Sequence, residues 1–100
     1  MRVGWAPLAL ERALEQVTCI ERDKPGAAEK WLDQLFDVVA QLEGLPELGR
    51  GLPELGNPAF RELDFRGYRV IYRLETGQVS VLTVRHGRRL LDLSELSEGG

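Results

Sequence analysis

The chain has 100 residues, of which 43% are hydrophobic and 29% are charged, which predicts one globular domain and leaves no room for two independent cores. The formal net charge of −3 gives no general attraction to nucleic acid. No apolar run is long enough for a transmembrane helix, and one Cys with one His excludes an internal disulfide and a Cys/His zinc site. We therefore expect a single domain over residues 1–96, a disordered tail over residues 97–100 and a reduced, cytoplasmic protein with no metal and no cofactor.

Two helices are predicted after a short opening strand. Residues 3–5 are apolar and a proline follows closely, which suits a strand that must stop. A helix begins at Pro7, where the missing N–H costs nothing, and a second helix covers residues 28–42. The link at residues 22–26 is short, so the two helices are expected to form an antiparallel hairpin. Helical spacing is shown by two apolar stripes: Leu10, Ala13, Leu14, Val17 and Ile20, then Ala28, Trp31, Leu32, Leu35, Val38, Val39 and Leu42.

A loop rich in Gly and Pro occupies residues 44–59. Within it, the sequence Leu-Pro-Glu-Leu-Gly occurs at residues 45–49 and again at residues 52–56. Two copies of five residues are too few for a solenoid, and a chance duplication of turn residues is the simpler interpretation.

Beyond this loop the apolar period drops to two, which predicts strands over residues 60–65, 68–74 and 79–84. The junctions Arg66-Gly67 and Thr76-Gly77 are short enough for hairpin turns, and residues 90–96 could form one or two helical turns. The predicted fold class is α+β: a short N-terminal strand, an antiparallel helix hairpin and a three-stranded antiparallel meander, with the helices on one face of the sheet.

Charge is unevenly distributed along the chain. Residues 1–60 hold six Lys or Arg against ten Asp or Glu, residues 61–89 hold seven Arg against three acids, and residues 90–100 hold three acids, so the three segments carry −4, +4 and −3. Guanidinium groups suit bidentate contacts to phosphate or carboxylate. The arginine-rich segment is therefore either a binding site for an anion or partner, or a strand face solvated by arginine.

Strand alternation places some of these arginines together. In the strand over residues 68–74, Arg69 and Arg73 share one face with Ile71, and the other face is apolar. If the apolar face packs on the helices, both arginines lie on the open face. Neighbouring strands could add two more, depending on register, and two further arginines follow the last strand. The candidate binding set is Arg61, Arg69, Arg73, Arg85, Arg88 and Arg89.

Three stretches of the C-terminal half are distinctive in their order: Phe60-Arg61-Glu62-Leu63, Gly67-Tyr68-Arg69-Val70-Ile71-Tyr72-Arg73 and Val81-Leu82-Thr83-Val84-Arg85-His86-Gly87-Arg88-Arg89. Together they resemble the RelE/ParE superfamily of toxins. Residues 5–9 and 27–31 are similar to the start of the family's two helices, and residues 46–55 to its loop, which also accounts for the apparent repeat. The resemblance covers about residues 3–92.

The resemblance implies the toxin half of a type II toxin–antitoxin module. Its partner would be a small cognate antitoxin whose C-terminal segment wraps the toxin, giving a hetero-oligomer. ParE-like members poison DNA gyrase, whereas RelE-like members cut mRNA in the ribosomal A site. The favoured hypothesis is a ParE-like toxin, and the first alternative is a RelE-like endoribonuclease. The second alternative is a degenerate, non-toxic member that only binds its antitoxin. Under the favoured reading, the arginine set contacts the target or the antitoxin.

The RelE-like alternative needs a base, an acid and cations that stabilise the charged phosphorane. The resemblance implies that Arg69 contacts the scissile phosphate, with Arg88 or Arg89 as a second cation. The family's proton-transfer residue has no match in residues 91–94, so His86 is the substitute candidate. Glu62 and Asp64 are weaker candidates for a base, since alternation places them opposite the Arg61 face and we expect them to be solvated.

The other distinctive side chains are expected to be structural. Trp31, Phe36, Phe65 and Tyr72 are predicted to line the core or a groove. Cys19 lies beside the first helix stripe with no His or Lys next to it, which predicts a buried, inert thiol.

Overall fold

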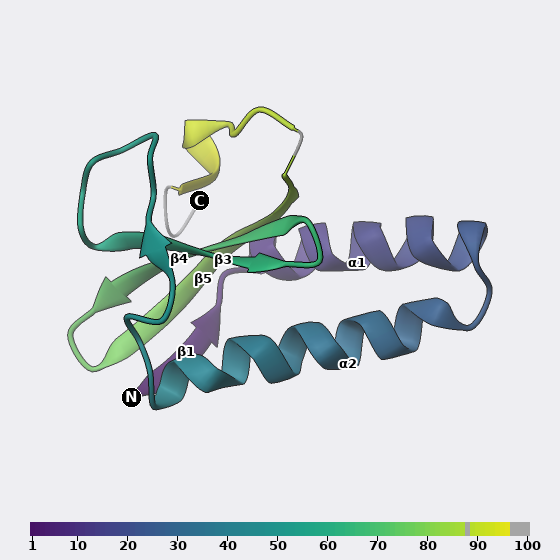
Figure 1. The fold of residues 1–100 in the computed structure, drawn as a ribbon, viewed down its shortest axis with the longest axis horizontal. Helices are drawn as coiled ribbons and strands as arrows, with labels where there is room; N and C mark the ends of the chain where they lie inside the picture. The colour runs from purple at the N-terminus through teal and green to yellow at the C-terminus, as the bar shows by residue number, and fades with distance from the viewer. Residues whose placement is uncertain (88, 97–100) are drawn as a thin grey trace.

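A computed structural model describes residues 1–87 and 89–96, in which two helices and one sheet follow the predicted order (Figure 1). The elements are β1 (Arg2–Trp5), α1 (Pro7–Asp23), α2 (Ala27–Ala40), the 3-10 helix η1 (Gln41–Glu43), β2 (Arg50–Gly51), β3 (Phe60–Phe65), β4 (Tyr68–Glu75), β5 (Gln78–His86) and the 3-10 helix η2 (Leu93–Leu96). The α+β fold class is confirmed. The tail prediction for residues 97–100 lies outside the described residues.

The sheet has the strand order β1-β5-β4-β3-β2. Strands β3, β4 and β5 form the predicted antiparallel meander, while β1 pairs in parallel with β5. The first hairpin turn is as tight as its sequence indicates, because Arg66 and Gly67 have φ of 53° and 85° and Phe65 pairs with Tyr68. β2 has two residues and pairs only with Glu62 and Arg61 of β3. The sequence patterns did not predict β2, which makes one edge of the sheet very short.

A bulge interrupts the alternation of β5. Tyr72 pairs with Val81 but its neighbour Ile71 pairs with Thr83, so β5 has one extra residue. As a result Val81 and Val84 both join the core under the helices, whereas Leu82 packs on the other face. Strict alternation would have placed Arg85 with Val81, beneath the helices. The bulge instead turns Arg85 to the face away from the helices.

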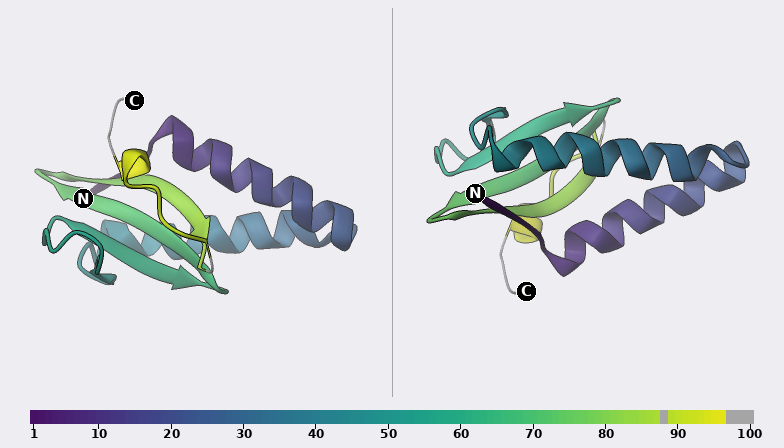
Figure 2. Two further views of the ribbon diagram at one scale, coloured as in Figure 1. Left: turned by 90° about the horizontal axis from the view of Figure 1, so that it is seen from above. Right: turned by 90° about the horizontal axis from the view of Figure 1, so that it is seen from below.

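Both helices cover one face of the sheet, and their free end extends past it (Figures 1 and 2). The helices are joined through Gly26, whose φ is 88° and whose N–H donates to the Glu21 carboxylate at 3.0 Å. The fully buried residues of α1 are two small ones, Ala9 and Ala13. The prediction of a buried Cys19 is wrong: this thiol is exposed, because it lies off the face of α1 whose Val17 and Ile20 pack against the core.

Apolar side chains form two clusters, one on each face of the sheet. The larger cluster lies between the helices and the sheet and contains the predicted core aromatics Trp31, Phe65 and Tyr72. Phe36 differs, because it is 40% exposed and its ring meets Trp5 at 5.1 Å. The second cluster lies on the other face, which is therefore less open than expected. It consists of Leu52, Ile71, Leu82 and Leu96, with Leu55, Phe60 and Leu91 packed against it.

The loop before β3 contacts both faces of the sheet near its β2 edge. Tyr72, on the helix side, accepts a hydrogen bond from Gly49 N–H at 2.8 Å and donates one to the Pro46 carbonyl at 2.9 Å. Leu52 of the second Leu-Pro-Glu-Leu-Gly copy is instead buried on the opposite face. A Cβ on Gly49 would lie 2.5 Å from the Glu62 carbonyl oxygen, so only glycine fits there. The first copy is therefore bonded to Tyr72 on the helix side, whereas the second copy packs through Leu52 on the opposite face.

Tyr72→Phe should lower the free energy of unfolding by about 1 to 3 kcal/mol, because two backbone groups lose the same buried hydroxyl partner. Tyr68→Phe is the matched control. Its hydroxyl makes one part-buried bond, to Gln16 Oε1 at 3.1 Å, so we expect a loss of about 1 kcal/mol or less. Urea denaturation of both variants provides the measurement, and equal losses would contradict the role given to Tyr72.

Candidate arginine-centred binding site

Arg69 lies on the sheet face away from the helices and is held by two carboxylates. Its Nε and Nη2 contact Glu62 Oε2 at 2.6 and 2.5 Å. Its Nη1 and Nη2 contact the two oxygens of Glu54 at 2.7 and 2.8 Å. Glu62 also accepts a bond from Arg50 Nε at 2.8 Å. Strands β2, β3 and β4 thus contribute one Arg-Glu-Arg cluster, and the loop before β3 adds a fourth charge.

The expectation that Glu62 is solvated is wrong. The residue is only 4% exposed, because guanidinium groups from the strands on both sides cover it and compensate its charge. Its backbone partner in β4 is Ile71, so Arg69 is its diagonal neighbour on the same face, within reach of a long side chain. Asp64, the direct partner of Arg69 in the ladder, is exposed as expected.

Arg69 and Glu54 hold each other in their charged forms. The hydrogen bond to Glu54, and to a smaller extent the one to Glu62, raises the pKa of Arg69 above its ordinary value. The hydrogen bonds from Arg69 lower the pKa of the Glu54 carboxyl. Arg69 is therefore suited to binding an anion and unsuited to moving a proton. Beside it lies a hollow of about 480 Å³, here named the Arg69 hollow, lined by Leu48, Gly49, Arg50, Glu62, Leu63, Asp64 and Arg69.

A second charged cluster is centred on Glu95, in η2. This residue is 7% exposed and accepts hydrogen bonds from Arg85 Nη1, from Arg12 Nε at 3.2 Å and from the Thr83 hydroxyl at 2.9 Å. Arg85 also donates from Nε to the Leu90 carbonyl at 2.8 Å. These bonds attach the C-terminal segment to β5 and α1.

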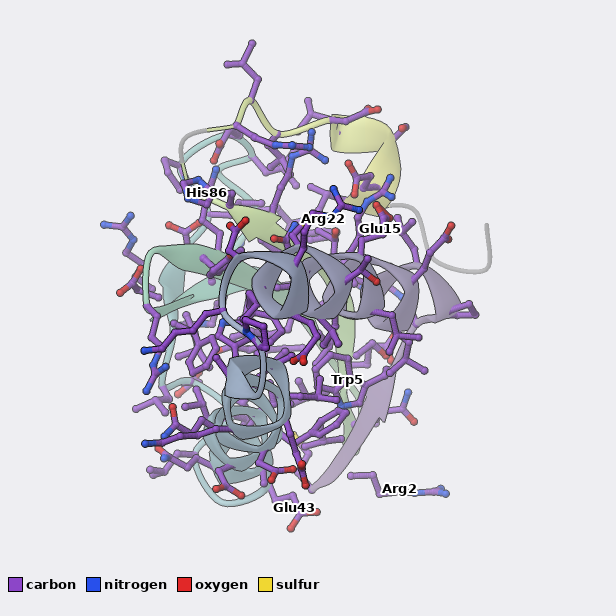
Figure 3. The ribbon with its side chains drawn as sticks, turned by 90° about the vertical axis from the view of Figure 1, so that its right-hand side faces the viewer. Arg2, Trp5, Glu15, Arg22, Glu43 and His86 are labelled. Carbon is purple, nitrogen blue, oxygen red and sulfur yellow. The ribbon has the colours of Figure 1, made fainter. Side chains whose placement is uncertain are left out.

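A smaller pocket adjoins the Glu95 cluster. Its volume is about 230 Å³, and we name it the Arg89 pocket. Figure 3 shows Glu15, one of its lining residues, on the side of α1 that faces the C-terminal segment. The lining consists of Arg12, Glu15, Gln16, Val84, Arg85, His86, Arg89, Asp92 and Glu95.

The predicted arginine set is thus divided among several environments. Arg61 pairs with Tyr72 in the ladder, so it lies on the helix side, where it donates to the Gly49 carbonyl at 2.9 Å. Arg73 contacts Glu75 at 2.5 Å and lies 6.0 Å over the Phe60 ring. Arg69 and Arg85 are direct cross-strand neighbours, but each turns to its own carboxylate.

The remaining two candidates follow β5. Arg89 is exposed and lines the Arg89 pocket, with its backbone N–H donating to the His86 carbonyl at 3.0 Å. Arg88 lies outside the described residues. Arg89 is thus the described arginine of the set whose side chain is most open to a partner.

Arg69 and His86, the pair that the RelE-like hypothesis requires, project from opposite faces of the sheet. His86 pairs with Tyr68 in the ladder, and their rings meet edge-on at 5.3 Å. Tyr68 in turn packs on Trp31 at 5.3 Å, on the helix side. The fold therefore does not bring the proposed phosphate-binding cation and the proposed proton carrier into one site.

Five charged residues of the two clusters were missed from the sequence. Glu62 was considered only as a solvated base, and Arg12, Arg50, Glu54 and Glu95 were given no role. The hairpin turn at residues 66–67 does fix the register that brings Glu62 near Arg69. No local pattern signals Glu54 or Glu95, since each reaches its arginine across a loop or from the C-terminal segment.

Among residues 1–87 and 89–96, no three His, Cys, Asp or Glu side chains are grouped so that they could hold a metal ion. In the same part of the chain, no helix is both long enough and apolar enough to cross a membrane.

The fold defines a class: a small α+β domain in which a helix hairpin covers one sheet face and paired arginines lie on the other. Comparison with known proteins identifies the family. The protein-family model described as "ParE toxin of type II toxin-antitoxin system, parDE" matches residues 3–91 of this sequence. Since this match spans most of the chain, the chain belongs to the ParE toxin family.

A solved structure supports the fold. The chain described as "Chromosomal ParDE TA system from P. aeruginosa" superposes with a TM-score of 0.61 at 20% sequence identity, covering 86% of this chain and 95% of that one. At this identity the likeness is one of fold. None of the curated proteins matches the sequence significantly.

Glu95→Ala should lower the free energy of unfolding by about 2 to 4 kcal/mol, since it leaves Arg85 and Thr83 without their shared acceptor. The control is Glu15→Ala, which removes a half-exposed partner of the same Arg12. An exposed ion pair of this kind contributes about 0.5 kcal/mol. Urea denaturation compares the two variants. If Glu95→Ala cost no more than Glu15→Ala, the C-terminal segment would not depend on this buried carboxylate.

Proposed function

We propose that this chain arrests growth by binding and inhibiting DNA gyrase, and that a cognate antitoxin neutralises it. Membership of the ParE toxin family supports the toxin role. The observation that carries the choice of target is the placement of Arg69 and His86 on opposite sheet faces, which disfavours RNA cleavage at a shared site. Charged arginines that cannot exchange protons remain well suited to holding a protein partner.

The Arg89 pocket is the proposed contact with the target. Arg12 and Arg85 are already engaged with the buried Glu95, whereas the Arg89 side chain is exposed beside them. Arginine is among the residues that most often dominate the energy of protein interfaces. Arg89 is therefore the first choice for a target contact, and Arg88 belongs to the same sequence segment.

Exposed apolar residues support the antitoxin part of the proposal. Leu10 and Leu14 of α1 were expected in the apolar stripe but are 40% and 58% exposed. They lie one helical turn apart and so present one continuous apolar strip. An apolar, acidic segment of an antitoxin would cover such a strip and complement the arginine side chains.

Arg89→Ala should weaken inhibition of purified gyrase by about tenfold or more, the effect expected for an arginine that dominates an interface. The assay measures the toxin concentration that halves DNA supercoiling, and circular dichroism verifies the fold. Arg22→Ala is the control, since Arg22 is exposed on α1 at the hairpin end (Figure 3) and should inhibit like the wild type. Equal potency of Arg89→Ala and the wild type would contradict this contact, and an inactive wild type would contradict the gyrase target.

A further inference from the structure

The outer edge of the Arg69 guanidinium is occupied by a carboxylate from the chain's own loop. Arg69 turns Nε and Nη2 toward Glu62 in the sheet, and Nη1 and Nη2 toward Glu54 outside it. The outer pair is bidentate, with two bonds of 2.7 and 2.8 Å. This is the geometry in which arginine recognises a carboxylate of another molecule.

The two carboxylates differ in how firmly they are held. Glu62 lies within β3, has a 4% exposed side chain and is shared by two arginines. The Glu54 side chain is 34% exposed and its residue belongs to no strand. Its backbone is fixed by Leu52, which is buried in the second apolar cluster, and by the half-buried Leu55. Glu54 can therefore rotate its carboxylate off Arg69 while the loop stays in place.

We propose that Arg69 is a carboxylate-binding position for a protein partner, and that Glu54 is an internal competitor which the partner's carboxylate displaces. The inference rests on the proposed function, because it takes the antitoxin to be that partner. A protein carboxylate fits better than a nucleic-acid phosphate, since the whole chain carries −3 and Asp64 lines the same hollow.

The surroundings of Arg69 indicate the kind of segment that would bind. The lining of the Arg69 hollow includes two apolar side chains, Leu48, which is 45% exposed, and Leu63. It also includes Arg50, whose side chain is 80% exposed. A segment with an acidic residue beside an apolar one could contact both the arginine and the apolar side chains. Its acid would take the place of Glu54 and its apolar side chain would cover Leu48.

The repeat in the loop supplies a matched control. Glu47 holds the same position in the first Leu-Pro-Glu-Leu-Gly copy as Glu54 holds in the second. Its side chain is 75% exposed and lies 3.9 Å from Arg61, on the other side of β3, so it does not occupy Arg69. Glu54→Gln and Glu47→Gln each make the net charge one unit more positive. Any general attraction to an acidic antitoxin therefore changes equally in both.

The experiment is an equilibrium competition for a limiting amount of the co-encoded antitoxin. Each variant is mixed with differently tagged wild-type chain, the antitoxin is recovered, and the captured toxins are counted by mass spectrometry. We expect Glu54→Gln to be captured in about three- to tenfold excess over the wild type, the size of effect expected for one partly exposed bidentate pair. Glu47→Gln should be captured equally with the wild type.

Two further variants make the result specific. Glu54→Asp keeps the charge but shortens the side chain, so it should also be enriched. On an Arg69→Gln background, Glu54→Gln should give no enrichment, since the group for which Glu54 competes is gone. Equal capture of Glu54→Gln and the wild type, equal enrichment of both glutamine variants, or enrichment without Arg69 would each overturn the inference. Failure of the antitoxin to capture even the wild-type chain would overturn the proposed function, and this inference with it.

Discussion

The buried carboxylate of Glu62 is the constraint on which the edge of this sheet depends. It lies between Arg50 of β2 and Arg69 of β4 and accepts hydrogen bonds from both. A two-residue strand such as β2 has too few ladder bonds to hold a sheet edge alone. The shared carboxylate fixes the edge by charge-assisted bonds. The loop residues before β2 can then bond to Tyr72 on the helix side, and Leu52 after β2 can pack on the other face.

The charged groups also explain how an acidic chain carries an arginine-rich sheet. Glu54, Glu62 and Glu95 reach their arginines from a loop, a neighbouring strand and the C-terminal segment. The positive charge predicted for residues 61–89 is therefore neutralised within the molecule at Arg69 and Arg85. A partner could bind the exposed Arg89, or could bind Arg69 through a carboxylate that replaces Glu54. Such a surface favours recognition of a protein over general adhesion to nucleic acid.

Local patterns predicted the two helices and the strands other than β2, because helical and strand periodicity report directly on which side chains face the core. The same reasoning placed Arg69 on the correct face, since Val70 and Tyr72 had to pack under the helices. It could not predict the bulge in β5, which shifts Arg85 by one position. A bulge depends on how two strands meet and leaves no fixed mark in either one. Nor could it predict that Glu62 is buried, because burial of a charge depends on partners brought from other segments.

The helices show the same limit. The apolar stripe of α1 was correct in its spacing, yet Leu14 is exposed because small residues make the closest contacts there. Cys19 is exposed because it lies beside that stripe, whose Val17 and Ile20 pack against the core. Sequence spacing defines a face of a helix but does not state how much of that face another element covers.

The most direct test of the central claim is to induce the chain alone in a bacterial host and map mRNA 5′ ends within minutes. The claim is that this family member acts through binding, with Arg69 and His86 on opposite faces of its sheet. It predicts arrested growth with intact transcripts. New 5′ ends inside translated codons would contradict it, because they would show ribosome-dependent cleavage despite the separation of Arg69 from His86.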